Sequence, residues 1–220
     1  MKLFKSIESV LSKITEELFQ RAPIPTSLYI ALALSFSLTF LFTDKNEFFD
    51  SKNNQYFVLA QNIQAGKGIS LFHHYKGQKV YFFDKNAQTY PTAYIPPAYS
   101  VLIIPAVASG FRDVSFNFVL IMNSLGVACV TLLLFRLISQ LFNSRVALYG
   151  AILYVLMPYT INSAGLRGFI IFAKLAILFP MFLEICVFKD KPNSGIMMLF
   201  LALSVYFRFE AVILIYLYFL

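Results

Sequence analysis

Long apolar blocks separated by short polar turns dominate the chain and predict most of its elements. A helix needs roughly 20 mainly apolar residues to cross a bilayer, and each block approaches or exceeds that length. We therefore expect one transmembrane span in each of four blocks. The predicted spans cover residues 26–43, about 116–142, about 146–162 and about 168–188.

The last apolar block, residues 195–220, carries Arg208 and Glu210 near its middle. One helix through the whole block would place two charges in hydrocarbon, each costing roughly 2.5–3.5 kcal/mol. We expect instead a span over about 192–207 that ends before these charges, and an incomplete span over 211–220. That last stretch has only about half of the usual span length, so the chain is expected to be the N-terminal part of a longer protein.

The first 25 residues have a different pattern, with apolar side chains at helical spacing and charged side chains between them. The apolar positions are Leu3, Phe4, Ile7, Val10, Leu11, Ile14, Leu18 and Phe19. This pattern is typical of an amphipathic helix that lies on a membrane surface. Lys2, Lys5 and Lys13 favour the cytoplasmic face for this helix.

Composition excludes an ordinary soluble domain, because 59% of the 220 residues are hydrophobic, only 13% are charged and the mean hydropathy is +0.70. The net charge of +7 comes largely from Lys and Arg beside apolar blocks, which favours lipid headgroups over nucleic acid as the partner. Cys129 and Cys186 lie inside apolar blocks, so no disulfide framework is expected. The sequence predicts an all-α integral membrane protein, a multi-span helical bundle in the inner or plasma membrane.

Basic residues also predict the orientation, because short loops rich in Lys and Arg stay in the cytoplasm. With a cytoplasmic N-terminus, residues 44–115 form a large extracytoplasmic loop. Within it, residues 96–111 are apolar but short and contain three prolines. If they formed a span, Arg145 and Lys189 would move outside. We therefore expect an interfacial helix over about 97–111.

The same loop predicts another juxtamembrane helix over about 51–64. Its apolar residues follow the spacing i, i+3, i+4, i+7, and glycines come after it at positions 66 and 68. These apolar residues are Tyr56, Leu59, Ala60 and Ile63. Further on, "FHHYKGQKVYFF" alternates loosely and favours a short hairpin, and "TYPTAYIPP" is expected to be extended.

Asp50 stands just before the predicted helix over 51–64 and has two interpretations. Asp is a preferred N-cap residue, and its charge suits the helix dipole. Alternatively, its carboxylate is a general base held at the membrane surface, with Asp44 and Glu47 as alternative acids nearby. Arg208 is either an interfacial anchor or a ligand for a phosphate group.

No metal or cofactor site is expected from the sequence. The adjacent His73 and His74 are poorly placed to bind one ion together, and no ligand spacing supports them. The sequence also has no glycine-rich phosphate loop and no nucleophilic triad motif.

Four stretches of the chain resemble the GT-C class of membrane glycosyltransferases, in particular the protein-mannosyltransferase and aminoarabinose-transferase-like group. They are "DSKNNQYFVLAQNIQAGKG", "TYPTAYIPPAYSVLIIPAVASGF", "RLISQLFNSRVALYGAILYVLMP" and "LALSVYFRFEAVILI", and they lie within residues 27–220. The resemblance implies that a sugar passes from a polyprenyl-phosphate-linked donor to a lipid, glycan or protein acceptor on the extracytoplasmic side. It further implies that Asp50 activates the acceptor hydroxyl or assists the transfer. Arg208, with Lys85 or another cation of the loop, is then expected to contact the donor phosphate.

Departures from the family's pattern leave two alternatives open. The family's acid usually stands four residues before the helix tyrosine, where this chain has Lys52, and many members carry a second acid where it reads Arg167-Gly168. Arg208 is followed by Phe209 instead of the frequent proline. One alternative is a non-catalytic relative that acts as an assembly partner. The other is a small transporter or lipid-binding membrane protein, for which broken helices at mid-membrane are typical.

Overall fold

The computed structural model is built almost entirely from helices, with one short two-stranded ladder. The residues that it describes are 2–20, 23–45, 48, 53–72, 89–91, 96–188 and 194–206.

The N-terminal segment forms α1 (Lys2–Thr15), which continues as a π-helical turn, η1 (Glu16–Gln20). The first apolar block forms α2 (Thr26–Phe42), a helix of 17 residues. Side chains of η1 and the end of α1 pack on the main bundle, where Ile14 and Leu18 contact a buried cluster around Leu133 and Phe182. The predicted amphipathic helix therefore lies with part of its apolar face against the protein.

A small unit that we call the cap follows α2. It consists of α4 (Asn53–Gln64), β1 (Ser70–Phe72), β2 (Thr89–Pro91) and α5 (Ala98–Ala108). α4 ends because Gly66 and Gly68 adopt positive φ angles of 74° and 69°, which glycine reaches without strain. β1 and β2 pair antiparallel, so the described chain has a short strand ladder within an otherwise helical fold. Most of the predicted hairpin in residues 72–83 lies outside the described residues.

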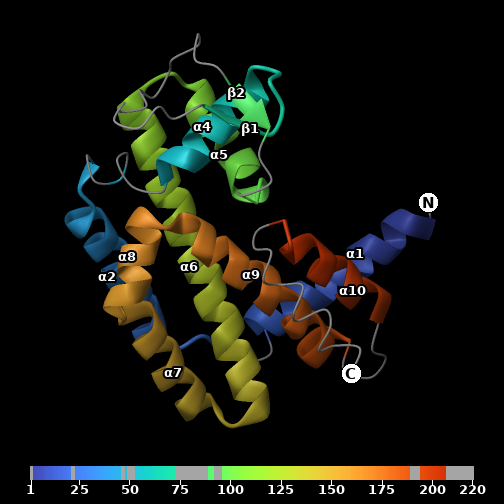
Figure 1. Ribbon diagram of the computed structural model, residues 1–220. Helices are drawn as coiled ribbons and strands as arrows, with labels where there is room; N and C mark the ends of the chain where they lie inside the picture. The colour runs from blue at the N-terminus through green and yellow to red at the C-terminus, as the bar shows by residue number, and fades with distance from the viewer. Residues whose placement is uncertain are drawn as a thin grey trace.

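The remaining helices form the main bundle. They are α6 (Arg112–Leu141), α7 (Ser144–Leu156), α8 (Pro158–Leu166), α9 (Gly168–Phe182), the π-helical turn η2 (Leu183–Val187) and α10 (Ser194–Ser204). Figure 1 shows α6 at the centre, with α2, α7 and α8 on one side and α9, α10 and α1 on the other. The cap lies over the end of α6 at which that helix begins, and α6 packs directly on α5, α7 and α9.

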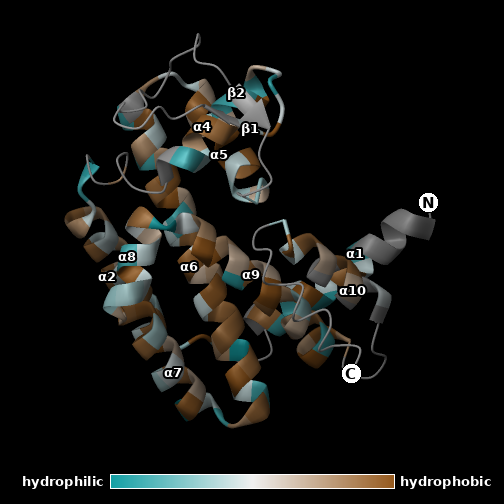
Figure 2. Ribbon diagram, in the orientation of Figure 1, coloured by the Kyte–Doolittle hydropathy of each residue, from teal (hydrophilic) through white to brown (hydrophobic). Residues whose placement is uncertain are grey.

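Two helical segments are long and apolar enough to cross a membrane, Asp113–Leu141 and Gly168–Val187. Figure 2 shows mostly hydrophobic residues along α6 and α9. α2 and α5 are apolar but shorter, and α7 with α8 would make a further span if the bent pair crosses as one. The described chain is thus a helical protein with two candidate membrane-spanning helices.

The block over 146–162, predicted as one span, is broken in the structure. α7 and α8 meet at Met157 with a bend of 50°. Met157 has an extended backbone (φ −62°, ψ 130°), the conformation that a following proline imposes on its neighbour. Pro158 then begins α8 at a position where its missing N–H costs nothing.

Candidate functional site at the cap

Four of the five predicted site residues lie outside the described part of the chain. They are Asp50, Glu47, Lys85 and Arg208. Asp44, the alternative acid that the structure does describe, is exposed and follows the end of α2 by two residues. Its backbone carbonyl accepts a hydrogen bond from the Phe48 N–H at 2.9 Å, which ties Asp44 to a residue that packs on the cap.

Phe48 anchors the chain to the cap just before Asp50. Its side chain is fully buried and packs edge to face on Phe57 of α4 and Phe116 of α6, with ring centroids 5.6 and 5.1 Å apart. Such aromatic pairs each contribute about 0.5–1.5 kcal/mol beyond their buried area. Phe48, in the connection between α2 and α4, is therefore held between the cap and the main bundle.

Tyr206 brings the end of the described chain to the same region. Its backbone carbonyl accepts a hydrogen bond of 3.1 Å from the N–H of Ala98, the first residue of α5. The N–H groups in the first turn of a helix have no partner within the helix, and Tyr206 satisfies one of them. The chain therefore returns to the cap two residues before Arg208.

An aromatic cluster fixes the cap helices on α9. Tyr56 of α4 stacks on Phe169 with ring centroids 4.9 Å apart, and meets Tyr99 of α5 edge to face at 5.2 Å. Tyr99 also contacts Phe172, with centroids 5.9 Å apart. Tyr56 is the helix tyrosine of the sequence resemblance, and in the structure it is buried and packs the cap against the main bundle.

A buried hydrogen-bond chain joins α5, α6 and α8 beneath this cluster. The Tyr99 hydroxyl donates to Asn123 Oδ1 at 3.1 Å, and Asn123 Nδ2 donates to the Ala164 carbonyl at 2.9 Å. Burial raises the pKa of Tyr99 above its usual range, so the hydroxyl remains a donor. Asn123 was not predicted as a site residue, although a polar residue inside a predicted span is the signal that marks such a position.

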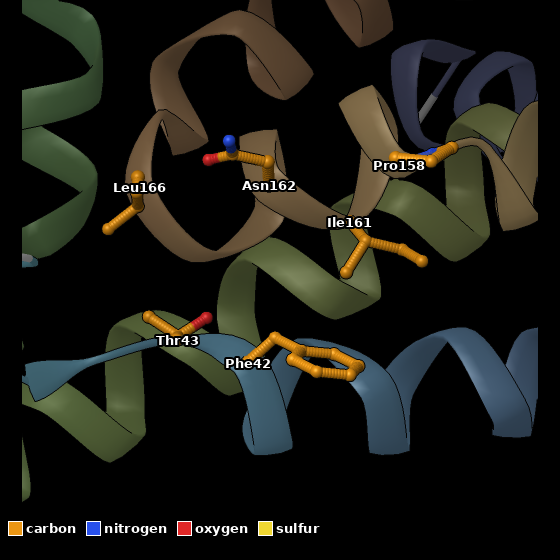
Figure 3. A pocket seen from close by; sticks show the side chains of 6 residues that line it. All are labelled: Phe42, Thr43, Pro158, Ile161, Asn162 and Leu166. Atoms are coloured by element: carbon orange, nitrogen blue, oxygen red, sulfur yellow. The ribbon is translucent and has the colours of Figure 1, made fainter.

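A cavity of about 350 Å³ opens between the end of α2 and α8. Figure 3 shows its lining residues, which are Phe42, Thr43, Pro158, Ile161, Asn162 and Leu166. The ends of the two helices are close, because a Cβ on Gly165 would overlap the Thr43 side chain. Asp44 and Arg167, both exposed, directly follow the lining residues Thr43 and Leu166. Asp44 and Arg167 are thus the next residues in the sequence after two residues that line one mostly apolar cavity.

A second cavity of about 230 Å³ lies deeper, between α2 and α6. Its polar lining comes from Ser35, Thr39 and Ser124, all of them buried. Thr39 Oγ1 donates to the Ser35 carbonyl at 2.9 Å, whereas the Ser124 hydroxyl has no hydrogen-bond partner among the described residues. A cavity of this size that is lined by hydroxyl groups can hold water.

Lys45 and Asp113 form an ion pair between the end of α2 and the start of α6. Their side chains are 37% and 77% exposed, so the pair contributes at most about 1 kcal/mol. It joins the same ends of α2 and α6 that border the cap.

Among the described residues no group of three or more His, Cys, Asp or Glu side chains is arranged to hold a metal ion. His73 and His74 lie outside those residues. Comparisons with protein-family models, with curated proteins and with solved structures find no match to this chain. Its function is therefore inferred from its own residues and geometry.

Proposed function

We propose that this protein is an integral membrane glycosyltransferase that takes a sugar from a polyprenyl-phosphate-linked donor. In this proposal the acceptor is a lipid, glycan or protein on the extracytoplasmic side. The N-terminus is cytoplasmic, α2 is the first span, and the cap forms part of the extracytoplasmic loop. The two long apolar segments, Asp113–Leu141 and Gly168–Val187, support the membrane setting.

The main support for the proposal comes from the residues just before Asp50 and Arg208, because both of them contact the cap. Phe48, two residues before Asp50, is buried against α4 and α6. Tyr206, two residues before Arg208, accepts a hydrogen bond from the start of α5. Phe48 and the α5 residue Tyr99 belong to one buried cluster. The proposed acid and guanidinium therefore follow two anchors on the same small unit.

The chemistry of glycosyl transfer fits an acid and a cation in these roles. The carboxylate of Asp50 takes the proton of the acceptor hydroxyl while the hydroxyl oxygen bonds to the anomeric carbon of the sugar. The bond between that carbon and the phosphate oxygen breaks, and Arg208, with Lys85, stabilises the negative charge on the departing lipid phosphate. Asp44 and Glu47 are the alternative bases.

The test is transfer of radiolabelled sugar from polyprenyl-phosphate donors in membranes that contain the protein from its full reading frame. Replacement of Asp50 by Asn is expected to lower the rate by about 100-fold or more, the usual loss of a general base. Asp113→Asn is the matched control, because Asp113 is an exposed acid at the same end of the bundle, and its rate should stay at the wild-type value.

Equal rates in the wild type and Asp50→Asn would refute Asp50 as the base and direct the same test to Asp44→Asn and Glu47→Gln. If the wild type transfers no sugar from any donor in a broad panel, the glycosyltransferase proposal is wrong. The non-catalytic relative would then be favoured, and Arg167 at the position of the family's second acid already points in that direction.

The bend between α7 and α8 favours a second candidate, a transporter or lipid-binding membrane protein. Broken helices at membrane depth are typical of transporters, where the free helix ends line a substrate site. The break at Met157 borders the cavity between α2 and α8 through Pro158. In this candidate Asp50 has no special role, so Asp50→Asn would leave function unchanged, and the transfer assay separates the two candidates.

A further inference from the structure

Lys174 is a charged residue inside α9, one of the two candidate membrane-spanning segments. Its ammonium nitrogen lies 4.9 Å from the ring centroid of Tyr154 and 5.2 Å from that of Tyr159. The same nitrogen is 3.5 Å from the Tyr154 hydroxyl. We call Lys174, Tyr154 and Tyr159 the lysine cage. Three helices supply it, namely α9, α7 and α8.

The bend at Met157 makes the lysine cage possible. Residues five apart on a straight α-helix are separated by roughly 140° around its axis, because there are 3.6 residues per turn. Tyr154 and Tyr159 are five apart, so on an unbroken helix they would not both face one ammonium group. The 50° bend between α7 and α8 brings both rings within cation–π distance of Lys174. The break in the predicted span therefore creates a specific polar arrangement.

The contacts that the structure describes for Lys174 are to aromatic rings and a hydroxyl group. No carboxylate among the described residues forms an ion pair with Lys174. The two cation–π contacts contribute about 0.5–2 kcal/mol each, which together is comparable to the roughly 2.5–3.5 kcal/mol that a charge at membrane depth costs. A charge that is kept at such a depth is typical of a functional site. A retained intramembrane charge of this kind points to an anionic ligand.

The position of the cage suits a ligand that arrives through the bilayer. Lys174 follows the start of α9 at Gly168 by six residues, which places it about 9 Å along the helix. Its ammonium lies beside the break between α7 and α8, where Tyr154 and Tyr159 contact it. Tyr159 is 49% exposed, which leaves one wall of the cage accessible from outside the bundle.

We propose that the lysine cage binds the phosphate group of a membrane lipid. Lys174 provides the positive charge and N–H donors, and the tyrosine hydroxyls provide further donors for phosphate oxygens. The lipid chains would remain in the bilayer beside α7, α8 and α9. This inference goes beyond the proposed glycosyl transfer, because phosphate binding at Lys174 requires no reaction and no particular sugar.

The test is lipid binding to the purified full-length chain, measured by native mass spectrometry with phosphatidic acid and phosphatidylcholine as probes. The wild type is expected to bind phosphatidic acid about tenfold more tightly than phosphatidylcholine, the scale of one charge-assisted interaction. Lys174→Met and Lys174→Gln should abolish this preference, and Lys174→Arg should keep it. Lys67→Met is the control, because Lys67 is an exposed lysine in the loop after α4, and its preference should equal that of the wild type. Lys13→Met tests the N-terminal helix, and the preference should persist in this variant.

Three outcomes would overturn the inference. One is an unchanged preference for phosphatidic acid in both Lys174→Met and Lys174→Gln. Another is a loss of the preference in Lys13→Met as large as in Lys174→Met, which would place the binding on the N-terminal helix. The third is displacement of phosphatidic acid by excess inorganic phosphate, which would indicate a site for free phosphate. Circular dichroism melting verifies that each variant is folded, and sugar transfer is not part of the readout.

Discussion

The side chain of Asn123 shows how single polar residues hold this molecule together. It is fully buried, accepts from the Tyr99 hydroxyl and donates to the Ala164 carbonyl. In an apolar interior each of these groups would otherwise lack a partner, and an unsatisfied buried polar group costs about 1–3 kcal/mol. The amide of Asn123 therefore connects the cap helix α5 to the main bundle through α6 and α8.

We predict that Asn123→Ala lowers the free energy of unfolding by about 1–3 kcal/mol, because it leaves the Tyr99 hydroxyl and the Ala164 carbonyl unpaired. Tyr99→Phe should cost less, about 1 kcal/mol, since it removes only one hydrogen bond. Reversible unfolding in mixed detergent micelles, followed by circular dichroism, measures both values. In the Asn123→Ala background, Tyr99→Phe should cost less than it does alone, and a strictly additive double variant would argue against the hydrogen-bond chain.

The close contact between Gly168 and Asn123 gives a second prediction for a single residue. A Cβ at position 168 would overlap the Asn123 amide. Hydrogen bonds on both sides hold that amide in place. Gly168→Ala is therefore expected to destabilise the protein by about 1–3 kcal/mol, the usual cost of overpacking. The same unfolding experiment measures this loss.

Gly150→Ala is the matched control for that experiment. A Cβ on Gly150 would meet only the end of the Ile138 side chain, at 3.3 Å. Alanine is favoured over glycine inside a helix by about 1 kcal/mol, so this change in α7 should leave stability equal or slightly higher. If Gly168→Ala is as stable as Gly150→Ala, the close contact between α9 and Asn123 is not a constraint.

At the scale of elements, Arg136 fastens the N-terminal helix to the main bundle. Its Nε and Nη2 atoms donate to the Leu18 carbonyl in η1, at 3.0 and 2.5 Å. The Arg136 side chain is only 4% exposed, so the contact takes place in a buried setting near the end of α6 that is far from the cap. Hydrogen bonds to charged groups contribute about 1.5–3 kcal/mol.

Replacing Arg136 by Leu should therefore release η1. We expect backbone amides of residues 16–20 to exchange their hydrogens about tenfold faster or more in the variant, because local opening becomes less costly. Hydrogen exchange with mass spectrometry measures this rate. Arg145→Leu, at an exposed position at the start of α7, should leave these rates unchanged, whereas equal effects of both variants would refute the role of Arg136.

Elements set by local patterns could be predicted from the sequence. The apolar stripe and the two following glycines predict a helix over about 51–64, and α4 covers Asn53–Gln64. Pro158 is visible in the sequence, but the apolar run on both sides favoured one continuous span. A proline begins a new helix or only kinks the old one according to the packing around it. Pro105 lies inside α5 without ending it, which shows the same ambiguity.

Contacts between distant segments could not be predicted in this way. The stripe that contains Tyr56 predicts a buried face, but the pairing of Tyr56 with Phe169 and Tyr99 depends on how α4, α5 and α9 meet. The lysine cage depends in the same way on the angle between α7 and α8. At the candidate site the sequence named Asp44 as an alternative acid, and the cavity beside Thr43 emerged only from the packing of α2 on α8.

At the scale of the whole molecule, the cap and the turn between α6 and α7 lie at opposite ends of α6. That helix has 30 residues and is therefore about 45 Å long, more than the roughly 30 Å of bilayer hydrocarbon. The cap holds the anchors of the proposed site, and the opposite end holds Arg136, Arg145 and the contact with η1. The proposed function requires that a membrane separates these two ends.

Cysteine labelling from one side of the membrane tests directly whether the two ends of α6 are separated by the bilayer. Cys129 and Cys186 are free thiols, so both are first replaced by Ala. Lys67→Cys then marks the exposed loop after α4, and Ser144→Cys marks the exposed turn between α6 and α7. A membrane-impermeant maleimide is applied to sealed right-side-out vesicles, before and after permeabilisation.

If the membrane separates the two ends, the cysteine at position 67 is labelled in sealed vesicles and the cysteine at position 144 is labelled only after permeabilisation. Equal labelling of both cysteines in sealed vesicles would contradict this separation, because the cap and the basic turn would then lie on the same side of the membrane.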